Sequence, residues 1–77
     1  MESVDQRLQA VFRSVFDLPE NSDVTVCDRY NTAGWDSMGH VNLMVAIEEE
    51  FGIPIDAGDS MNIDSYRSAL QYLLQAA

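Results

Sequence analysis

Segment 34–39, with the sequence Gly-Trp-Asp-Ser-Met-Gly, contains the serine best placed for chemistry. Ser37 follows Asp36, a residue type that favours the N-cap position of a helix, and it precedes an apolar helical pattern. We therefore expect Ser37 to be the first helical residue, with its hydroxyl facing solvent. A phosphate group on this hydroxyl would meet unpaired backbone N–H groups and the positive end of the helix dipole. The position favours a phosphodiester, and no base accompanies Ser37 to make it a nucleophile.

Two other interpretations of Ser37 are a plain helix cap and a hydrolase nucleophile. A serine beside an aspartate at a helix start commonly serves only as part of the cap. The nucleophile elbow of hydrolases reads G-x-S-x-G, and Trp35 stands where its first glycine belongs. The single histidine, His40, shares the helix with Ser37 but is expected to point in another direction. We therefore predict no catalytic residue, and we expect His40 to be a packing or surface residue.

The remaining side chains of possible chemical interest give weaker patterns. Cys27 has no second cysteine to pair with, and we expect it to be a small apolar filler. Asp56, Asp59 and Asp64 do not follow the ligand spacing of an EF-hand calcium loop. The sequence therefore predicts no metal site. We expect Trp35 to anchor a loop against the folded domain.

The composition limits the chain to one small, acidic domain over residues 1–77. Seventy-seven residues, 47% of them apolar, are enough for a single hydrophobic core. Four arginines and no lysine face 13 acidic residues, which gives a net charge of −9. Such a chain lacks the cations that nucleic-acid binding requires, and it favours partners with a basic patch. Self-repulsion also favours a monomer.

The sequence shows neither an apolar run long enough to span a membrane nor the N-terminal pattern of a signal peptide. One cysteine without a disulfide partner fits a reducing compartment. We therefore expect a complete, cytoplasmic protein.

Helical periodicity appears in three segments, about Ser3 to Asp17, Ser37 to Phe51 and Asp64 to Gln75. A shorter turn fits within Asp56 to Met61, although Gly58 weakens that pattern. The predicted fold class is therefore all-α: a small four-helix bundle with three main helices and one short helix. A long loop joins the first two helices.

Capping residues mark the expected helix ends. Ser3 and Gln6 form the pattern of a capping box at the start of the first segment. That helix must end before Pro19, because a residue that precedes proline is driven out of the helical region. Asp36 is expected to cap the second helix, and Gly52 sits where a C-cap glycine belongs.

The loop from Pro19 to Trp35 is the difficult part of the sequence. Residues 23–27 alternate between polar and apolar types like a β-strand, but a single strand has no partner for its backbone groups. We therefore reject a strand there. We expect Val24, Val26 and Tyr30 to anchor this loop over the open end of the bundle.

The second helix carries two apolar stripes, which lie roughly 140° apart at about 100° per residue. The first is assigned to the core and consists of Leu43, Met44, Ile47 and Phe51. The second, which we call the surplus stripe, consists of Met38, Val41 and Val45. An apolar stripe rimmed by Glu48 and Glu49 suits docking of a partner with a basic rim, whereas Glu50 is expected to be simply solvated. The alternative is that the long loop covers the surplus stripe.

Asp36-Ser37-Met38, followed by the run VNLMVAIEEEF over residues 41–51, resembles the acyl carrier protein family. The resemblance extends over essentially the whole chain in length, acidity and helix order. It implies that Ser37 is the attachment site of 4′-phosphopantetheine, which a separate phosphopantetheinyl transferase adds from coenzyme A. The thiol of that arm would hold acyl groups as thioesters and present them to acyl-loading, acyl-modifying and acyl-transferring enzymes. The protein itself would be no enzyme.

The resemblance also maps partner docking onto the second helix, in agreement with the surplus stripe. The docking positions that it implies are Asp36, Met38, Val41, Val45, Glu48 and Glu49.

Some positions depart from the fatty-acid type of carrier. Gly39 and Asn42 stand where acidic residues are frequent in that type, and Trp35 replaces a small residue. These differences favour a dedicated pathway, whether fatty-acyl, polyketide-type or aminoacyl. The rival class is a helical protein–protein interaction module without a prosthetic group. A cargo pocket would be lined by Met44, Ile47, Ile63 and Leu70.

Overall fold

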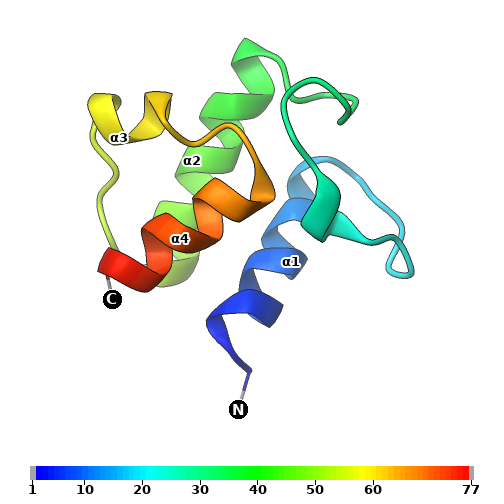
Figure 1. The fold of residues 1–77 in the computed structure, drawn as a ribbon, viewed down its shortest axis with the longest axis horizontal. Helices are drawn as coiled ribbons and strands as arrows, with labels where there is room; N and C mark the ends of the chain where they lie inside the picture. The colour runs from blue at the N-terminus through cyan, green and yellow to red at the C-terminus, as the bar shows by residue number, and fades with distance from the viewer. Residues whose placement is uncertain (1, 77) are drawn as a thin grey trace.

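The computed structural model describes residues 2–76, which form helices joined by loops (Figure 1). The elements are α1 (Val4–Val15), the 3₁₀ turn η1 (Val24–Val26), α2 (Ser37–Phe51), α3 (Ala57–Met61) and α4 (Tyr66–Ala76). The predicted all-α bundle of three main helices and one short helix is confirmed. The long loop between the first two main helices is also present, and it contains η1.

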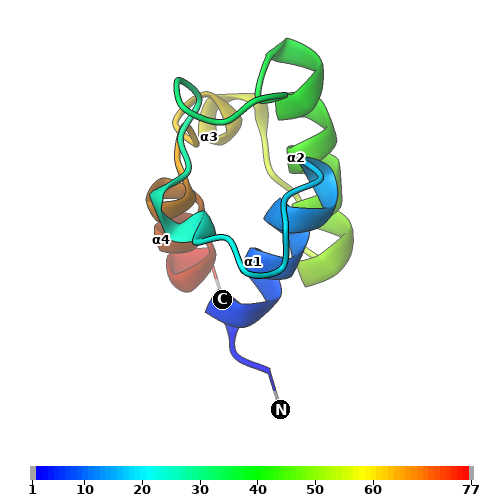
Figure 2. The same ribbon diagram turned by 90° about the vertical axis from the view of Figure 1, so that its right-hand side faces the viewer.

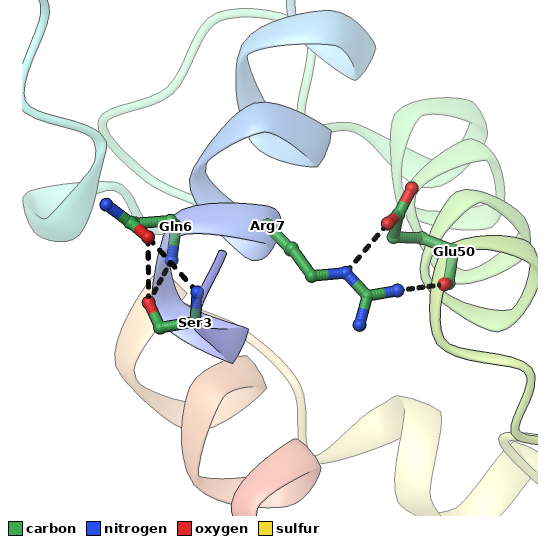
Figure 3. Close-up of polar contacts among 4 residues, drawn as sticks. All are labelled: Ser3, Gln6, Arg7 and Glu50. Carbon is green, nitrogen blue, oxygen red and sulfur yellow. Dashed lines mark hydrogen bonds and ion pairs between the residues drawn. The ribbon is translucent and has the colours of Figure 1, made fainter. Parts of the chain in front are cut away.

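Helix α1 begins at the predicted capping box and ends earlier than expected. The Ser3 hydroxyl accepts a hydrogen bond from the Gln6 backbone N–H, and the Gln6 side chain accepts one from the Ser3 backbone (Figure 3). The sequence predicted helix up to Asp17, but Asp17 adopts a left-handed conformation with φ of 52°. The Leu18 N–H then bonds back to the Arg13 carbonyl, which closes the helix.

Helix α2 has the boundaries that the sequence predicted. The Asp36 carboxylate caps its start by accepting a bond from the Gly39 N–H. Gly52 ends it in the left-handed region with φ of 67°, and its N–H bonds to the Glu48 carbonyl.

The core lies where α1 packs against α2 and α4, with η1 beside α4 (Figure 2). Aromatic rings occupy its centre: the Phe12 ring lies 5.8 Å from Phe16, 5.5 Å from Trp35 and 5.1 Å from Tyr66, each edge to face. These contacts join three separate parts of the chain. The buried apolar residues are Leu8, Val11, Phe12, Phe16, Val24, Trp35, Leu43, Met44, Ile47, Ile63, Tyr66, Ala69 and Leu73.

The long loop is anchored differently from our expectation. Val24 is buried as predicted, but Val26 is 65% exposed and Tyr30 is 94% exposed, so neither is an anchor. Backbone bonds hold the loop instead: the Tyr66 N–H donates to the Cys27 carbonyl, and the Arg29 N–H donates to the Asp64 carbonyl. The rejection of a strand was correct, because this pairing amounts to one isolated bridge rather than a ladder.

Helices α3 and α4 follow the predicted pattern with one error. Asp56 caps α3, and α4 begins at Tyr66, two residues later than the predicted Asp64. Near the end of α4, Leu74 is 59% exposed, whereas Tyr72 packs against the core. The helix therefore turns its final residues to solvent.

Glu50 is not simply solvated as we expected. The Arg7 Nε lies 2.9 Å from the Glu50 carboxylate, and Arg7 also donates to the Glu50 backbone carbonyl at 2.6 Å (Figure 3). The same guanidinium lies 4.6 Å from the centre of the Phe51 ring. Arg7 thus ties the first turn of α1 to the last turn of α2.

Tyr66 joins the start of α4 to the start of α1. Its side chain is buried, and its hydroxyl donates to the backbone carbonyl of Asp5 at 2.9 Å and to the Asp5 carboxylate. Burial, followed by the hydrogen bond to Asp5 and the charge of Asp5, raises the pKa of the Tyr66 hydroxyl far above its usual range.

We expect the free energy of unfolding to fall as pH rises above about 10. There the unfolded chain loses the Tyr66 proton while the folded chain keeps it, so deprotonation favours unfolding. Tyr66→Phe should remove this part of the alkaline loss, although it also removes the bond to Asp5. Tyr30→Phe is the control at an exposed tyrosine and should behave like the wild type. Urea denaturation at a series of alkaline pH values measures both, and equal pH slopes in the wild type and Tyr66→Phe would contradict the assignment.

Candidate functional site

Ser37 is the first residue of α2 and its side chain is exposed. It lies at the end of α2 that the long loop approaches, where the green part of the chain leaves the loop (Figure 1). The opposite end of α2 contacts the first turn of α1 through Arg7. Ser37 is therefore exposed to solvent, as the sequence predicted.

The positive end of α2 is partly satisfied within the chain. The Asp36 Oδ1 accepts from the Gly39 N–H at 2.8 Å, and the Asp36 backbone carbonyl accepts from the His40 N–H at 2.8 Å. We expected a set of unpaired N–H groups to meet a phosphate on Ser37, and for Gly39 this is wrong. The Asp36 carboxylate already places one negative charge at this helix end.

The structure explains why position 39 is a glycine rather than an acidic residue, which the sequence alone did not indicate. A Cβ atom at position 39 would lie 1.8 Å from the Gly34 carbonyl oxygen, far inside van der Waals contact. Gly34 itself has φ of 90°, a conformation that side chains rarely adopt. The two glycines let the loop backbone press directly against the first turn of α2.

Trp35 anchors the loop as predicted. Its side chain is 4% exposed, and its ring stacks on Phe16 with centroids 5.3 Å apart. The indole Nε1–H donates to His40 Nδ1 at 3.0 Å, and His40 Nε2 lies 3.0 Å from the Ser60 carbonyl oxygen. Both ring nitrogens of His40 are thus engaged away from Ser37, in agreement with its predicted packing role.

The surplus stripe is exposed, so the alternative in which the loop covers it is wrong. Met38 is 70% exposed, Val41 56% and Val45 45%. Of the two rim carboxylates, Glu49 is exposed, whereas Glu48 is half-buried and accepts a bond from the Ile55 N–H at 2.8 Å. Glu48 therefore also supports the segment between α2 and α3, a role that its sequence position did not indicate.

The four residues expected to line a cargo pocket belong to the hydrophobic core or pack against it. Met44, Ile47 and Ile63 are buried in the core, and Leu70 is half-buried against it. A cavity of about 190 Å³ lies instead between the start of α1 and the ends of α2 and α4. Its lining consists of Val4, Arg7, Phe51, Ile53 and Leu73.

Cys27 is half-buried and packs against the core, as expected of a small apolar filler. Within residues 2–76, no three His, Cys, Asp or Glu side chains are grouped so that they could hold a metal ion. Over the same residues, each helix is too short or too polar to cross a membrane.

Known proteins are similar to this chain in sequence. Residues 6–73 match the family of the phosphopantetheine attachment site. The chain is also 30% identical over 76 residues to acyl carrier protein 2 of Pseudomonas aeruginosa, an alignment that covers 99% of this chain and 96% of that protein. The chain belongs to the acyl carrier protein family. It is accordingly a carrier and not a catalyst, and its cofactor is covalently attached 4′-phosphopantetheine.

Chloroplast proteins are similar over part of their length. The chain is 29% identical over 63 residues to acyl carrier protein 3, chloroplastic, of Cuphea lanceolata, and 30% identical over 64 residues to acyl carrier protein 1, chloroplastic, of Casuarina glauca. These alignments cover 82% and 83% of this chain but 44% and 47% of the relatives. The chain thus spans less than half the length of these two plant proteins.

Acyl carrier proteins interact with a phosphopantetheinyl transferase and with acyl-handling enzymes.

The contact between Gly34 and Gly39 predicts a large effect of one methyl group. We expect Gly39→Ala to lower the free energy of unfolding by about 1–3 kcal/mol, because its Cβ must push the loop backbone away. Gly58→Ala is the matched control in α3, where the new Cβ would meet its nearest atom at an ordinary 3.5 Å. That variant should be neutral or stabilised by up to about 1 kcal/mol. Urea denaturation measures the free energy of unfolding of both variants. If Gly39→Ala were as stable as the wild type, the close approach of the Gly34 carbonyl to position 39 would be contradicted.

Proposed function

We propose that Ser37 is the attachment site of 4′-phosphopantetheine and that the chain carries acyl intermediates for a dedicated pathway. The observation that carries this proposal is the exposed serine at the first position of α2, immediately after a loop that packing holds in place. The residues around it fit the group: Ser37 is exposed, whereas the side chain of the nearby Trp35 is buried in the core.

The attachment needs a base from outside the chain. The Ser37 oxygen forms the new bond to phosphorus, the phosphoanhydride bond of coenzyme A breaks, and the nucleotide leaves. The hydroxyl proton goes to the transferase, because both ring nitrogens of His40 are already hydrogen-bonded elsewhere. When attached, the group supplies a flexible arm with a terminal thiol that holds an acyl group as a thioester.

The capping of α2 suits an arm that must move. Asp36 occupies the Gly39 N–H and adds a negative charge beside Ser37, so this helix end attracts an anionic phosphodiester less than an uncapped end would. The covalent bond to Ser37 would therefore hold the phosphodiester with little additional attraction from the helix end, which leaves the arm free to move. A tethered substrate then reaches a docked active site as an intramolecular event.

The docking face that we propose is the surplus stripe with its acidic rim. Exposed apolar side chains supply contact area, and the rim carboxylates select partners with basic patches. The net charge of −9 adds long-range steering and favours a monomer. The proposed docking residues are Asp36, Met38, Val41, Val45, Glu48 and Glu49.

A dedicated pathway in the cytoplasm is the finer part of the proposal. Gly39 and Asn42 leave the first turns of α2 without the acidic side chains frequent in fatty-acid carriers. Partners of this chain therefore find fewer negative charges near Ser37 than near Glu48 and Glu49. Fatty-acyl, polyketide-type and aminoacyl cargo all remain compatible with such a face.

Incubation with coenzyme A and a broad-range phosphopantetheinyl transferase should add one phosphopantetheine per chain. Ser37→Ala should abolish this addition, because the accepting oxygen is lost. Ser14→Ala, at another exposed serine within a helix, should be modified like the wild type. Intact mass spectrometry measures the addition. If the wild-type chain gained no mass, the interaction module without a prosthetic group would be favoured.

Val45→Asp should weaken docking while the fold persists, because it places a charge inside the exposed apolar stripe. We expect kcat/KM for modification of Ser37 to fall by roughly tenfold, the factor that about 1.4 kcal/mol of lost binding represents. Leu74→Asp is the control at an exposed leucine of α4 and should leave kcat/KM unchanged. Thermal melting verifies that both variants fold. Equal kcat/KM for Val45→Asp and the wild type would show that the surplus stripe is not the docking face.

A further inference from the structure

His40 connects three parts of the chain beside the attachment serine. From α2 its Nδ1 accepts from the Trp35 indole in the loop, at 3.0 Å. Its Nε2 lies 3.0 Å from both the carbonyl oxygen and the hydroxyl of Ser60 in α3. The His40 ring also stacks on Trp35, with centroids 6.3 Å apart and planes 16° from parallel. The imidazole thus bridges the loop, α2 and α3.

The chemistry of these partners fixes the protonation state of the ring. An indole N–H can only donate, so Nδ1 must carry a lone pair. A backbone carbonyl can only accept, so Nε2 must carry the proton that points to Ser60. Only the neutral Nε2–H tautomer satisfies both partners. In the imidazolium both nitrogens are donors, and Nδ1–H would then oppose the Trp35 N–H.

We propose that neutral His40 is a positioning residue for the modification of Ser37, and that a proton on Nδ1 breaks its hydrogen bond to Trp35 in the loop that precedes the serine. This inference rests on the proposed function of Ser37. Trp35 adjoins Asp36, the cap of α2, so its anchoring fixes the approach of the chain to the serine. The bond to Ser60 survives protonation, because Nε2 remains a donor. Acid therefore removes the hydrogen bond between the loop and α2, while the bond to α3 remains.

The charged groups on the elements around the ring do not replace this lost bond. Asp36 precedes α2 and caps it, and Asp56 caps α3 by accepting from the Asp59 N–H. Within residues 2–76, neither these carboxylates nor that of Asp59 is hydrogen-bonded to the His40 ring or to the Trp35 indole N–H. Histidine is the side chain whose charge ordinarily changes between about pH 5 and 8.

The chain is suited to a direct test, because it has one tryptophan and one histidine. In ¹⁵N spectra of the unmodified protein at neutral pH, the His40 ring should show the Nε2–H tautomer. On acidification, the Trp35 indole N–H should lose its protection from solvent exchange with the same midpoint as the His40 ring. An Nδ1–H tautomer, or an indole N–H unchanged through the His40 titration, would overturn the proposal. This measurement does not depend on whether Ser37 is modified.

A non-titrating variant tests the consequence for Ser37. His40→Asn offers an amide oxygen near the place of Nδ1, while His40→Phe keeps a stacking ring without an acceptor. The ratio of wild-type to His40→Asn kcat/KM for the transferase should fall as pH falls, by roughly fivefold, the factor of a hydrogen bond worth about 1 kcal/mol. Titration of the transferase itself cancels in this ratio.

The outcomes separate the two proposals. A ratio that is flat across the His40 midpoint overturns the positioning role, and so does full activity of His40→Phe at neutral pH. If no variant and no wild-type chain accepts phosphopantetheine at any pH, the proposed function of Ser37 fails, and the ¹⁵N spectra still decide the tautomer and the loss of the bond to Trp35.

Discussion

The contact of the long loop with the first turn of α2 is the constraint on which the rest of the structure depends. The Gly34 carbonyl oxygen lies where a side chain at position 39 would have to be, and Trp35 next to it is inserted among Phe12 and Phe16. A loop of this length would otherwise lose much conformational entropy on being ordered. Burial of the indole and the backbone bonds to α4 offset that loss. As a result, the loop and the first turn of α2 hold the exposed Ser37 in a fixed position.

The sequence predicted the parts of the fold that depend on local signals. Ser3, Asp36 and Gly52 each act through neighbours a few residues away, so their capping roles could be inferred from type and spacing. Helical arithmetic also separated the surplus stripe from the core face of α2, although it left open whether the loop covers that stripe, which the structure shows to be exposed. Ser37 was found in the same way, as the residue after a cap.

Long-range contacts escaped that reasoning. The partner of Glu50 is Arg7, 43 positions away, and nothing in the charge pattern of α2 indicated it. In the loop, we expected Val26 to be an anchor like Val24, but the chain forms a 3₁₀ helix there and Val26 is exposed to solvent. Gly39 was interpreted only as the replacement of an acidic residue, whereas the structure shows that the Gly34 carbonyl leaves no room for a side chain there. Each error arose where the surroundings of a residue depend on the path of the chain rather than on the types of its neighbours in the sequence.

Glu48 serves two purposes at once. Its carboxylate rims the exposed stripe and also accepts the Ile55 N–H that shapes the connection to α3. A cation from a bound protein would compete with that N–H for the same oxygens. Loss of that bond would loosen the backbone between α2 and α3, so a protein bound at the proposed docking face would also change the support of the short helix without contacting it.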